Sequence, residues 1–200
     1  MLAGLSRYIV CSRVTKRPIF IFLSPDTRPN DSLQVFAFED DYSFGVLASN
    51  THWQWFVAQC STLAGRFRYT SNTVFDTFPW PQNPSMAAVE SVRDAARALR
   101  AERVRVMREN NWSLRDLYRS IELPGEHPLK TAQNGLDRTV RSAYGMGERD
   151  EQLEFLLDLN RELAERESRK ETVIGPGLRA LGGQFDDAYV DFVSEDTILG

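Results

Sequence analysis

The sequence predicts an α+β protein, in which a small mixed α/β subdomain is followed by an all-α helical segment. Short apolar runs separated by turn residues fill the first part of the chain, a pattern typical of strands and loops. Beyond residue 85 the apolar residues recur at a period near 3.6, which indicates amphipathic helices. We therefore expect a mixed subdomain over residues 1–84, a helical domain over 85–167 and a weakly structured tail over 168–200.

Three strands and one helix are expected before residue 65. The strands are placed in short apolar or β-prone runs at residues 8–11, 19–23 and 33–38. Ser49 or Asn50 is suited to cap the helix that follows. The apolar side chains of this helix, among them Trp53 and Phe56, form one stripe, and Gly65 is placed to end it.

Basic and aromatic residues alternate directly after this helix, in Arg66-Phe67-Arg68-Tyr69. In a strand, this order puts the two arginines on one face and the two aromatic rings on the other. The run Phe78-Pro79-Trp80-Pro81 cannot be regular helix, because each proline keeps the residue before it out of α geometry. We expect this run to be an extended connector that ends the first subdomain.

Four helices are expected in the second part of the chain. They are placed at residues 85–107, 113–121, 129–144 and 150–163. Ser85 and Asp150 are candidate caps, and Ser113 with Asp116 has the spacing of a capping box.

Charge is distributed unevenly along the chain, whose net charge is −4. Residues 1–85 carry seven Lys and Arg against six Asp and Glu, a balance of +1, and residues 86–200 carry seventeen against twenty-two, a balance of −5. The basic residues of the first part gather at Arg7, Arg13, Lys16 and Arg17, and again at Arg66 and Arg68. Such clusters favour contact with phosphate, and a solvated surface explains them as well.

No catalytic set stands out in the sequence. His52 and His127 lack the partner spacing of a metal site and are expected to be structural or at the surface. Glu39-Asp40-Asp41 is expected to be a solvated turn, with cation binding as the alternative. The chain shows no nucleophile elbow, glycine-rich phosphate loop or methyltransferase cofactor motif. On these grounds we expect a binding module without a cofactor or metal of its own.

The sequence also bears on membranes and location. No run approaches the roughly 18 apolar residues that span a bilayer, and the N-terminal residues lack the pattern of a secretion signal. We expect no membrane partner, and the cytoplasm is the expected compartment.

Several short motifs occur in a fixed order along the first subdomain. They are Arg17-Pro18-Ile19, Phe22-Leu23-Ser24-Pro25-Asp26, Phe44-Gly45-Val46-Leu47-Ala48-Ser49-Asn50, His52-Trp53-Gln54-Trp55, Arg66-Phe67-Arg68-Tyr69-Thr70-Ser71 and Phe78-Pro79-Trp80-Pro81. This series resembles the target recognition domain of MmeI-like DNA methyltransferases, the combined restriction–modification enzymes of bacteria. The motifs Ser113-Leu114-Arg115-Asp116-Leu117-Tyr118, Leu136-Asp137-Arg138-Thr139-Val140 and Ala143-Tyr144-Gly145 resemble the C-terminal helical segment of the same family.

The resemblance implies a sequence-specific DNA recognition module of an adenine-specific methyltransferase system, with double-stranded DNA as its partner. Full-length members use S-adenosylmethionine in a methyltransferase core, and magnesium is implied for those that carry a nuclease. This chain lacks the motifs of both regions, so activity would need a separate catalytic polypeptide. A structural or protein-interaction subunit, or a non-functional C-terminal remnant, is the alternative.

Six residues are expected to contact DNA: Arg66, Arg68, Lys16, Arg17, Arg28 and Ser71. The planar fork of arginine can bond both major-groove acceptors of guanine, so Arg66 and Arg68 are the expected base readers, with surface or ion-pairing roles as the alternative. The three cations Lys16, Arg17 and Arg28 lie on expected loops and are assigned to phosphates, which fix register without reading sequence.

Overall fold

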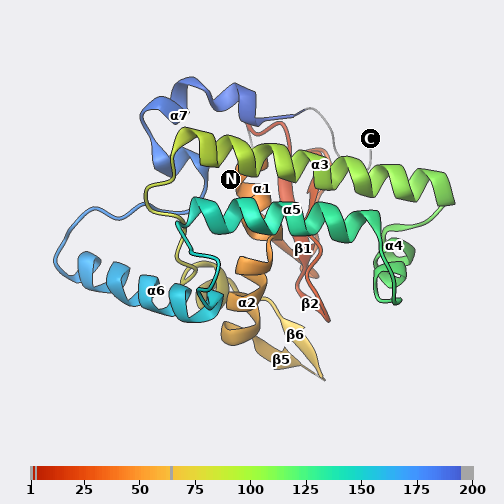
Figure 1. Ribbon diagram of the computed structural model, residues 1–200, viewed down its shortest axis with the longest axis horizontal. Coiled ribbons are helices and arrows are strands. Elements are labelled where there is room, and N and C mark those ends of the chain that lie inside the picture. Colours follow the sequence, from red (N-terminus) through yellow and green to blue (C-terminus); the bar gives the residue numbers. More distant parts are fainter. Residues whose placement is uncertain (1, 3, 64, 195–200) are drawn as a thin grey trace.

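The computed structural model describes residues 2, 4–63 and 65–194. Small antiparallel sheets and several helices make up this part of the chain, which confirms the predicted α+β class (Figure 1). Among the described residues, no helix combines the length and the apolar character that crossing a bilayer requires. The division into 1–84, 85–167 and 168–200 stays a prediction.

The first sheet contains β1 (Tyr8–Ser12), β3 (Ile21–Leu23) and β4 (Leu33–Phe36) in the order β3-β1-β4. Both neighbours run antiparallel to β1, and Ile9 lies opposite Phe22 on one side and Phe36 on the other. The central strand is apolar and buried through Cys11, as expected for a strand covered on both faces.

The second sheet is smaller and contains β2 (Val14–Thr15), β5 (Ser61–Leu63) and β6 (Arg66–Arg68) in the order β2-β6-β5. The helix that was expected to run to Gly65 instead ends earlier. It is α2 (Asn50–Gln59), and the chain then turns back as β5 to pair with β6. The positive φ of Gly65, +73°, permits the tight turn between the two strands.

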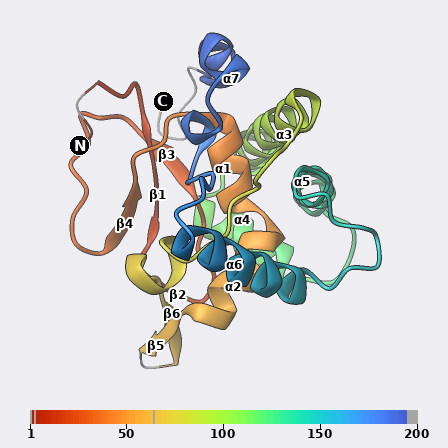
Figure 2. The same cartoon turned by 90° about the vertical axis from the view of Figure 1, so that its left-hand side faces the viewer.

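Helix α1 (Asp41–Ala48) lies between the first sheet and the two long helices α3 (Met86–Asn110) and α5 (Pro128–Ala143), as Figure 2 shows. Gly45 makes this close approach possible. A Cβ atom at that position would lie 2.7 Å from Cγ1 of Val92 and 3.2 Å from Cδ1 of Leu136. Ser49 caps α2, as one of the two predicted candidates.

The remaining helices are α4 (Leu114–Ile121), with the predicted capping box of Ser113 and Asp116, and α6 (Gln152–Ser168). Their buried side chains, Leu117 and Leu156, belong to the same hydrophobic cluster as Phe22 of the first sheet. One continuous core therefore joins the mixed part of the chain to the helices.

Residues 178–192, in the segment predicted to be a weakly structured tail, form short helical elements that pack against the core. This segment contains η2 (Leu178–Leu181), α7 (Gln184–Asp187) and η3 (Tyr189–Phe192), and it buries Leu178, Phe185 and Phe192 in the core. Glycine-rich turns, which suggested disorder in the sequence, let these separated apolar side chains fold back onto the domain.

The prediction of a solvated turn at Glu39-Asp40-Asp41 is wrong, because all three residues are buried. Asp40 caps α1, and its carboxylate accepts hydrogen bonds from the backbone and hydroxyl of Ser43. Burial raises the pKa of Asp40 to about 6.

Asp41 is the centre of a buried ion-pair cluster, which we call the Asp41 cluster. Its carboxylate lies 2.8 Å from Arg7, 2.6 Å from Arg97 and 2.8 Å from Arg100. Arg7 was expected in a surface cluster but is only 1% exposed, and it stacks over the ring of Phe22. This cluster ties the start of β1 and the start of α1 to α3.

Candidate nucleic-acid interface

Strand β6 separates its basic and aromatic side chains as the alternation predicted. Arg66 and Arg68 are exposed, whereas the ring of Phe67 packs 5.7 Å from the rings of both Trp53 and Phe56. Figure 1 shows β5 and β6 at the lower end of the molecule, next to α2. Helix α2 thus supports the strand from one side and leaves the two arginines free to contact a partner on the other.

A buried hydrogen bond fixes the end of β6. The hydroxyl of Tyr69 lies 2.9 Å from Nε2 of His52, and the Tyr69 amide donates to the carbonyl of Arg13 at 2.7 Å. Burial lowers the pKa of His52 to about 3, so the ring is neutral at physiological pH. Of the two positions expected for His52, structural or at the surface, the structure shows the buried one.

The predicted phosphate-binding residues Lys16 and Arg17 follow β2, the partner strand of β6. The hydroxyl of Thr15 donates to the Arg17 carbonyl at 2.8 Å and accepts from its amide at 3.3 Å, which forms a tight turn. The guanidinium of Arg17 lies 5.6 Å from the ring of Trp53, within cation–π range. Both side chains are exposed.

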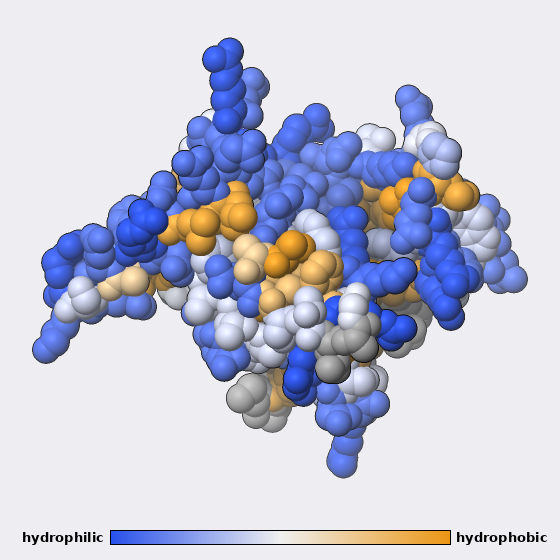
Figure 3. All heavy atoms as spheres, turned by 90° about the horizontal axis from the view of Figure 1, so that it is seen from below, coloured by the Kyte–Doolittle hydropathy of each residue, from blue (hydrophilic) through white to orange (hydrophobic). Residues whose placement is uncertain are grey.

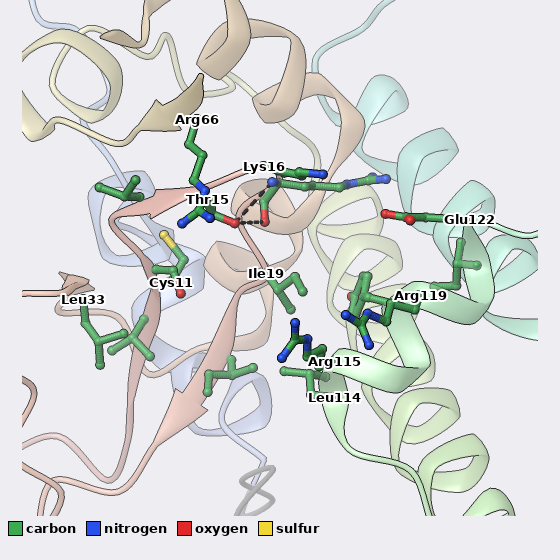
Figure 4. A pocket seen from close by; sticks show the side chains of 17 residues that line it. Cys11, Thr15, Lys16, Ile19, Leu33, Arg66, Leu114, Arg115, Arg119 and Glu122 are labelled. Carbon is green, nitrogen blue, oxygen red and sulfur yellow. Dashed lines mark hydrogen bonds between the residues drawn. The ribbon is translucent and has the colours of Figure 1, made fainter. Parts of the chain in front are cut away.

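Strands β2 and β6 lie on one wall of a groove of about 770 Å³, and α4 forms the opposite wall. We call it the basic groove. Its floor is mostly apolar and includes Val10, Ile19, Ile21 and Leu33. Figure 4 shows Arg66 entering from β6, while Arg115 and Arg119 extend from α4 on the opposite side.

Five cations line the basic groove: Lys16, Arg17, Arg66, Arg115 and Arg119. Within the part of the chain that the structure describes, none of the five lies in a salt bridge. The one acidic residue among the lining residues is Glu122. Five cations against one carboxylate make this groove suited to a polyanion.

Sequence reasoning missed Arg115 and Arg119 as candidates. The two residues are four positions apart on a predicted helix, a spacing that places both on one face. That spacing was the available signal, but nothing in the sequence placed this helix opposite β6.

The structure brings three of the six predicted residues into the basic groove, namely Lys16, Arg17 and Arg66. Arg68 is exposed on the same strand but does not line the groove. Arg28 is exposed in the loop between β3 and β4, away from the groove lining. Ser71 begins η1 (Ser71–Phe75), where its hydroxyl donates to Oε1 of Gln34 at 3.4 Å.

A carboxylate on α5 holds the first turn of α2. Oδ1 of Asp137 accepts hydrogen bonds from the Asn50 amide at 2.8 Å and from the Gln133 side chain at 2.9 Å. A negative charge at the start of a helix is favourable, because the first amide groups have no partner within the helix. Asp137 therefore positions the helix that supports β6.

The described residues contain no group of three His, Cys, Asp or Glu side chains that fits a metal ion. The sequence likewise has no glycine-rich turn of the kind that holds S-adenosylmethionine or a phosphate. The described residues therefore do not fit a resident metal ion, and the sequence does not fit S-adenosylmethionine.

Comparison with known proteins identifies relatives for most of the chain. Residues 11–82 match the family model described as the target recognition domain of MmeI. DNA methyltransferase A of Bacillus subtilis (strain 168) is 30% identical over 144 residues, which make up 70% of this chain and 16% of that protein. This alignment is longer than the family match and so extends into the helical part.

A solved structure shares the fold. The Type IIL restriction-modification enzyme MmeI in complex with DNA matches 82% of this chain and 22% of its own, with a TM-score of 0.70 at 23% identity. The chain thus spans only a small part of the length of either relative. Residues 11–82 are therefore similar to the target recognition domain of MmeI, and the residues that follow share its fold.

Proposed function

We propose that this chain is a sequence-specific DNA recognition module of an adenine-specific DNA methyltransferase of a restriction–modification system, acting on double-stranded DNA in the cytoplasm. One observation carries the proposal: two exposed arginines stand on the outer face of β6, at the edge of a groove lined by five cations. Arginine is the side chain that reads guanine most often, and clustered cations bind phosphate. The match of residues 11–82 to the MmeI target recognition domain supports the same assignment.

The surface around this site fits a polar partner. Figure 3 views the molecule from the side of α2 and β6, where most atoms belong to hydrophilic residues and the hydrophobic ones gather in separate patches. Protein–DNA interfaces are more polar and more basic than protein–protein interfaces. An obligate protein contact would instead require a larger continuous apolar area.

We further propose that catalysis belongs to a methyltransferase region outside these 200 residues, on a separate polypeptide. The matched relative supports a region outside these residues, because the matched part makes up only 16% of that protein. That region would bind S-adenosylmethionine, and magnesium where a nuclease is present. The role proposed for this chain is to choose the sequence on which that chemistry acts.

The experiment that tests the proposal is selection of the purified chain against a random pool of duplex DNA at moderate salt. The expected result is a recovered consensus sequence. Arg66→Ala is expected to relax the preference at one position, since a bidentate arginine–guanine pair supplies about 1–3 kcal/mol of discrimination. Lys16→Ala is expected to weaken binding equally on all sequences and to lower the salt slope by about 0.9.

Arg161→Ala is the matched control, because Arg161 is an exposed arginine on α6, away from the basic groove. It is expected to leave both preference and affinity unchanged. A folded chain that enriches no sequence would contradict the proposal and favour a structural subunit or a remnant. Equal effects of R66A and K16A on every sequence would contradict the division between base reading and phosphate binding.

A further inference from the structure

We propose that α4 is the second DNA-binding wall of the basic groove, where Arg115 and Arg119 bind phosphates of one DNA strand while Arg66 contacts the duplex from the opposite wall. The inference rests on the proposed function and extends it to the helical part of the chain. The sequence alone assigned that part no contact with DNA. Three features of the structure carry the inference.

The first feature is the rigid placement of α4 against the strands. Leu117 is fully buried, and the capping box of Ser113 and Asp116 fixes the start of the helix. From α3, the buried Arg103 donates to the Phe20 carbonyl at 2.8 Å, and its guanidinium lies 5.5 Å from the ring of Tyr118. Arg103 therefore holds the segment before β3 and the groove face of α4 at a fixed separation.

The second feature is that, among the described residues, the two arginines of α4 have no ion-pair partner. Four residues of α-helix rise about 6 Å, so Arg115 and Arg119 present two cations along one side of the groove. Among the described residues, neither forms a salt bridge or side-chain hydrogen bond. Arg105 on α3 is different, because Glu102 and Glu109 of its own helix both lie 2.6 Å from it. The arginines of α4 thus remain available to an external anion.

The third feature is the elongated shape of the site. A second cavity of about 440 Å³ shares Arg17, Tyr118 and Ile121 with the basic groove and continues along α5 to Lys130. Arg17 and Lys130 line this second cavity together with the carboxylate of Asp137, so the site is an extended path rather than a single closed pocket. A sugar–phosphate strand has this form, with a charge at each nucleotide, and backbone contacts of this kind fix the register of a DNA-binding protein.

The test compares the full chain with the double variant R115A/R119A by equilibrium binding to its selected duplex and to an unrelated duplex, over a series of salt concentrations. The salt slope is expected to fall by about 1.8, because two phosphate contacts are lost. Affinity is expected to fall on the order of tenfold on both duplexes at low salt, with sequence preference unchanged. The control R161A/R169A removes two exposed arginines near the C-terminal half of α6 and is expected to keep the wild-type slope.

A second variant tests the same wall through a change that is expected to raise, rather than lower, the affinity for DNA. Glu122→Gln removes the one carboxylate among the lining residues of the basic groove, so it is expected to tighten duplex binding about two- to threefold. A variant that merely disturbed folding would not bind more tightly. Circular dichroism checks that each variant is folded.

The outcomes separate the inference from the proposed function. A wild-type chain that binds no duplex would overturn both. A wild-type chain that binds DNA while R115A/R119A keeps the wild-type slope would overturn only the role of α4. If the double variant loses binding to polyglutamate but keeps its DNA affinity, the wall serves an acidic protein segment, and the inference is wrong.

Discussion

His52 shows how a single buried ring makes stability depend on pH. The pKa of this ring is about 3 in the folded chain, against an ordinary value near 6.5, because burial disfavours the charged form. Below about pH 6.5 the unfolded chain takes up a proton that the folded chain does not. The free energy of unfolding therefore falls as pH drops from about 6.5 toward 3, by up to about 1.4 kcal/mol per pH unit.

This dependence can be tested by measuring the free energy of unfolding in urea for the wild type and for His52→Gln, at pH 7.5 and at pH 5. The stability advantage of the wild type over H52Q is expected to be about 2 kcal/mol smaller at pH 5. Asp40, whose pKa is raised to about 6, changes stability in the opposite direction, but it is present in both chains and cancels. If the wild type is more stable than H52Q by the same amount at both pH values, the His52 ring binds a proton in the folded chain at pH 5, which contradicts the prediction.

The sequence predicted whether a side chain is exposed or buried for some residues and not for others. The outward position of Arg66 and Arg68 was predictable, because it depends only on the alternation of a strand. The burial of Arg7 and Asp41 was not, since their pairing joins residues 34 positions apart and needs the third partner on α3. Exposed cations can be inferred from local pattern, whereas buried ion pairs depend on tertiary contacts.

At the scale of elements, the α2–α5 contact supports the proposed reading strand. Replacing Asp137 by Ala removes the acceptor of the Asn50 amide, so stability is expected to fall by about 1–2 kcal/mol. Faster hydrogen exchange at the first turn of α2 is the specific readout. Asp137→Asn keeps an acceptor oxygen and is expected to recover most of the loss. Equal losses in both variants would show that the charge, rather than the hydrogen bond, holds the helix.

Helix boundaries were largely predictable, because side chains that cap helices act locally. Ser49, Ser85 and Ser113 each cap the helix for which they were candidates. Strand β5 was missed because Cys60 and Ala64 continue the apolar stripe of α2 in the sequence, and only pairing with β6 makes residues 61–63 extended. The placement of α4 opposite β6 was missed for a similar reason, since it depends on packing against α3.

At the scale of the whole molecule, the Asp41 cluster and the continuous core couple the mixed part to the helices. Asp41→Asn leaves two buried guanidinium groups without this carboxylate, so the free energy of unfolding is expected to fall by about 3–5 kcal/mol. The expected unfolding is a single transition, coincident by tryptophan fluorescence and far-ultraviolet circular dichroism. Two separate transitions would show that the halves fold independently. R161A, which removes an exposed pair, is the control.

The overall class was predictable from the change of hydrophobic period near residue 85, but the extent of the core was not. Leu178, Phe185 and Phe192 are separated by glycines and polar residues, so no local periodicity marked them as core. The basic groove was predictable only in part for the same reason. Its β wall follows from a sequence motif, and its α4 wall follows from the way in which the whole chain packs.

The exposed face of β6 has a consequence for how this protein can evolve. Arg66 and Arg68 project away from Phe67, whose ring packs against the aromatic side chains of Trp53 and Phe56 on α2. Exposed substitutions that leave such packing intact usually change stability by less than about 0.5 kcal/mol. Under the proposed function, a lineage can therefore exchange either arginine in single mutational steps without passing through a misfolded ancestor, and each exchange is expected to change the preferred DNA sequence.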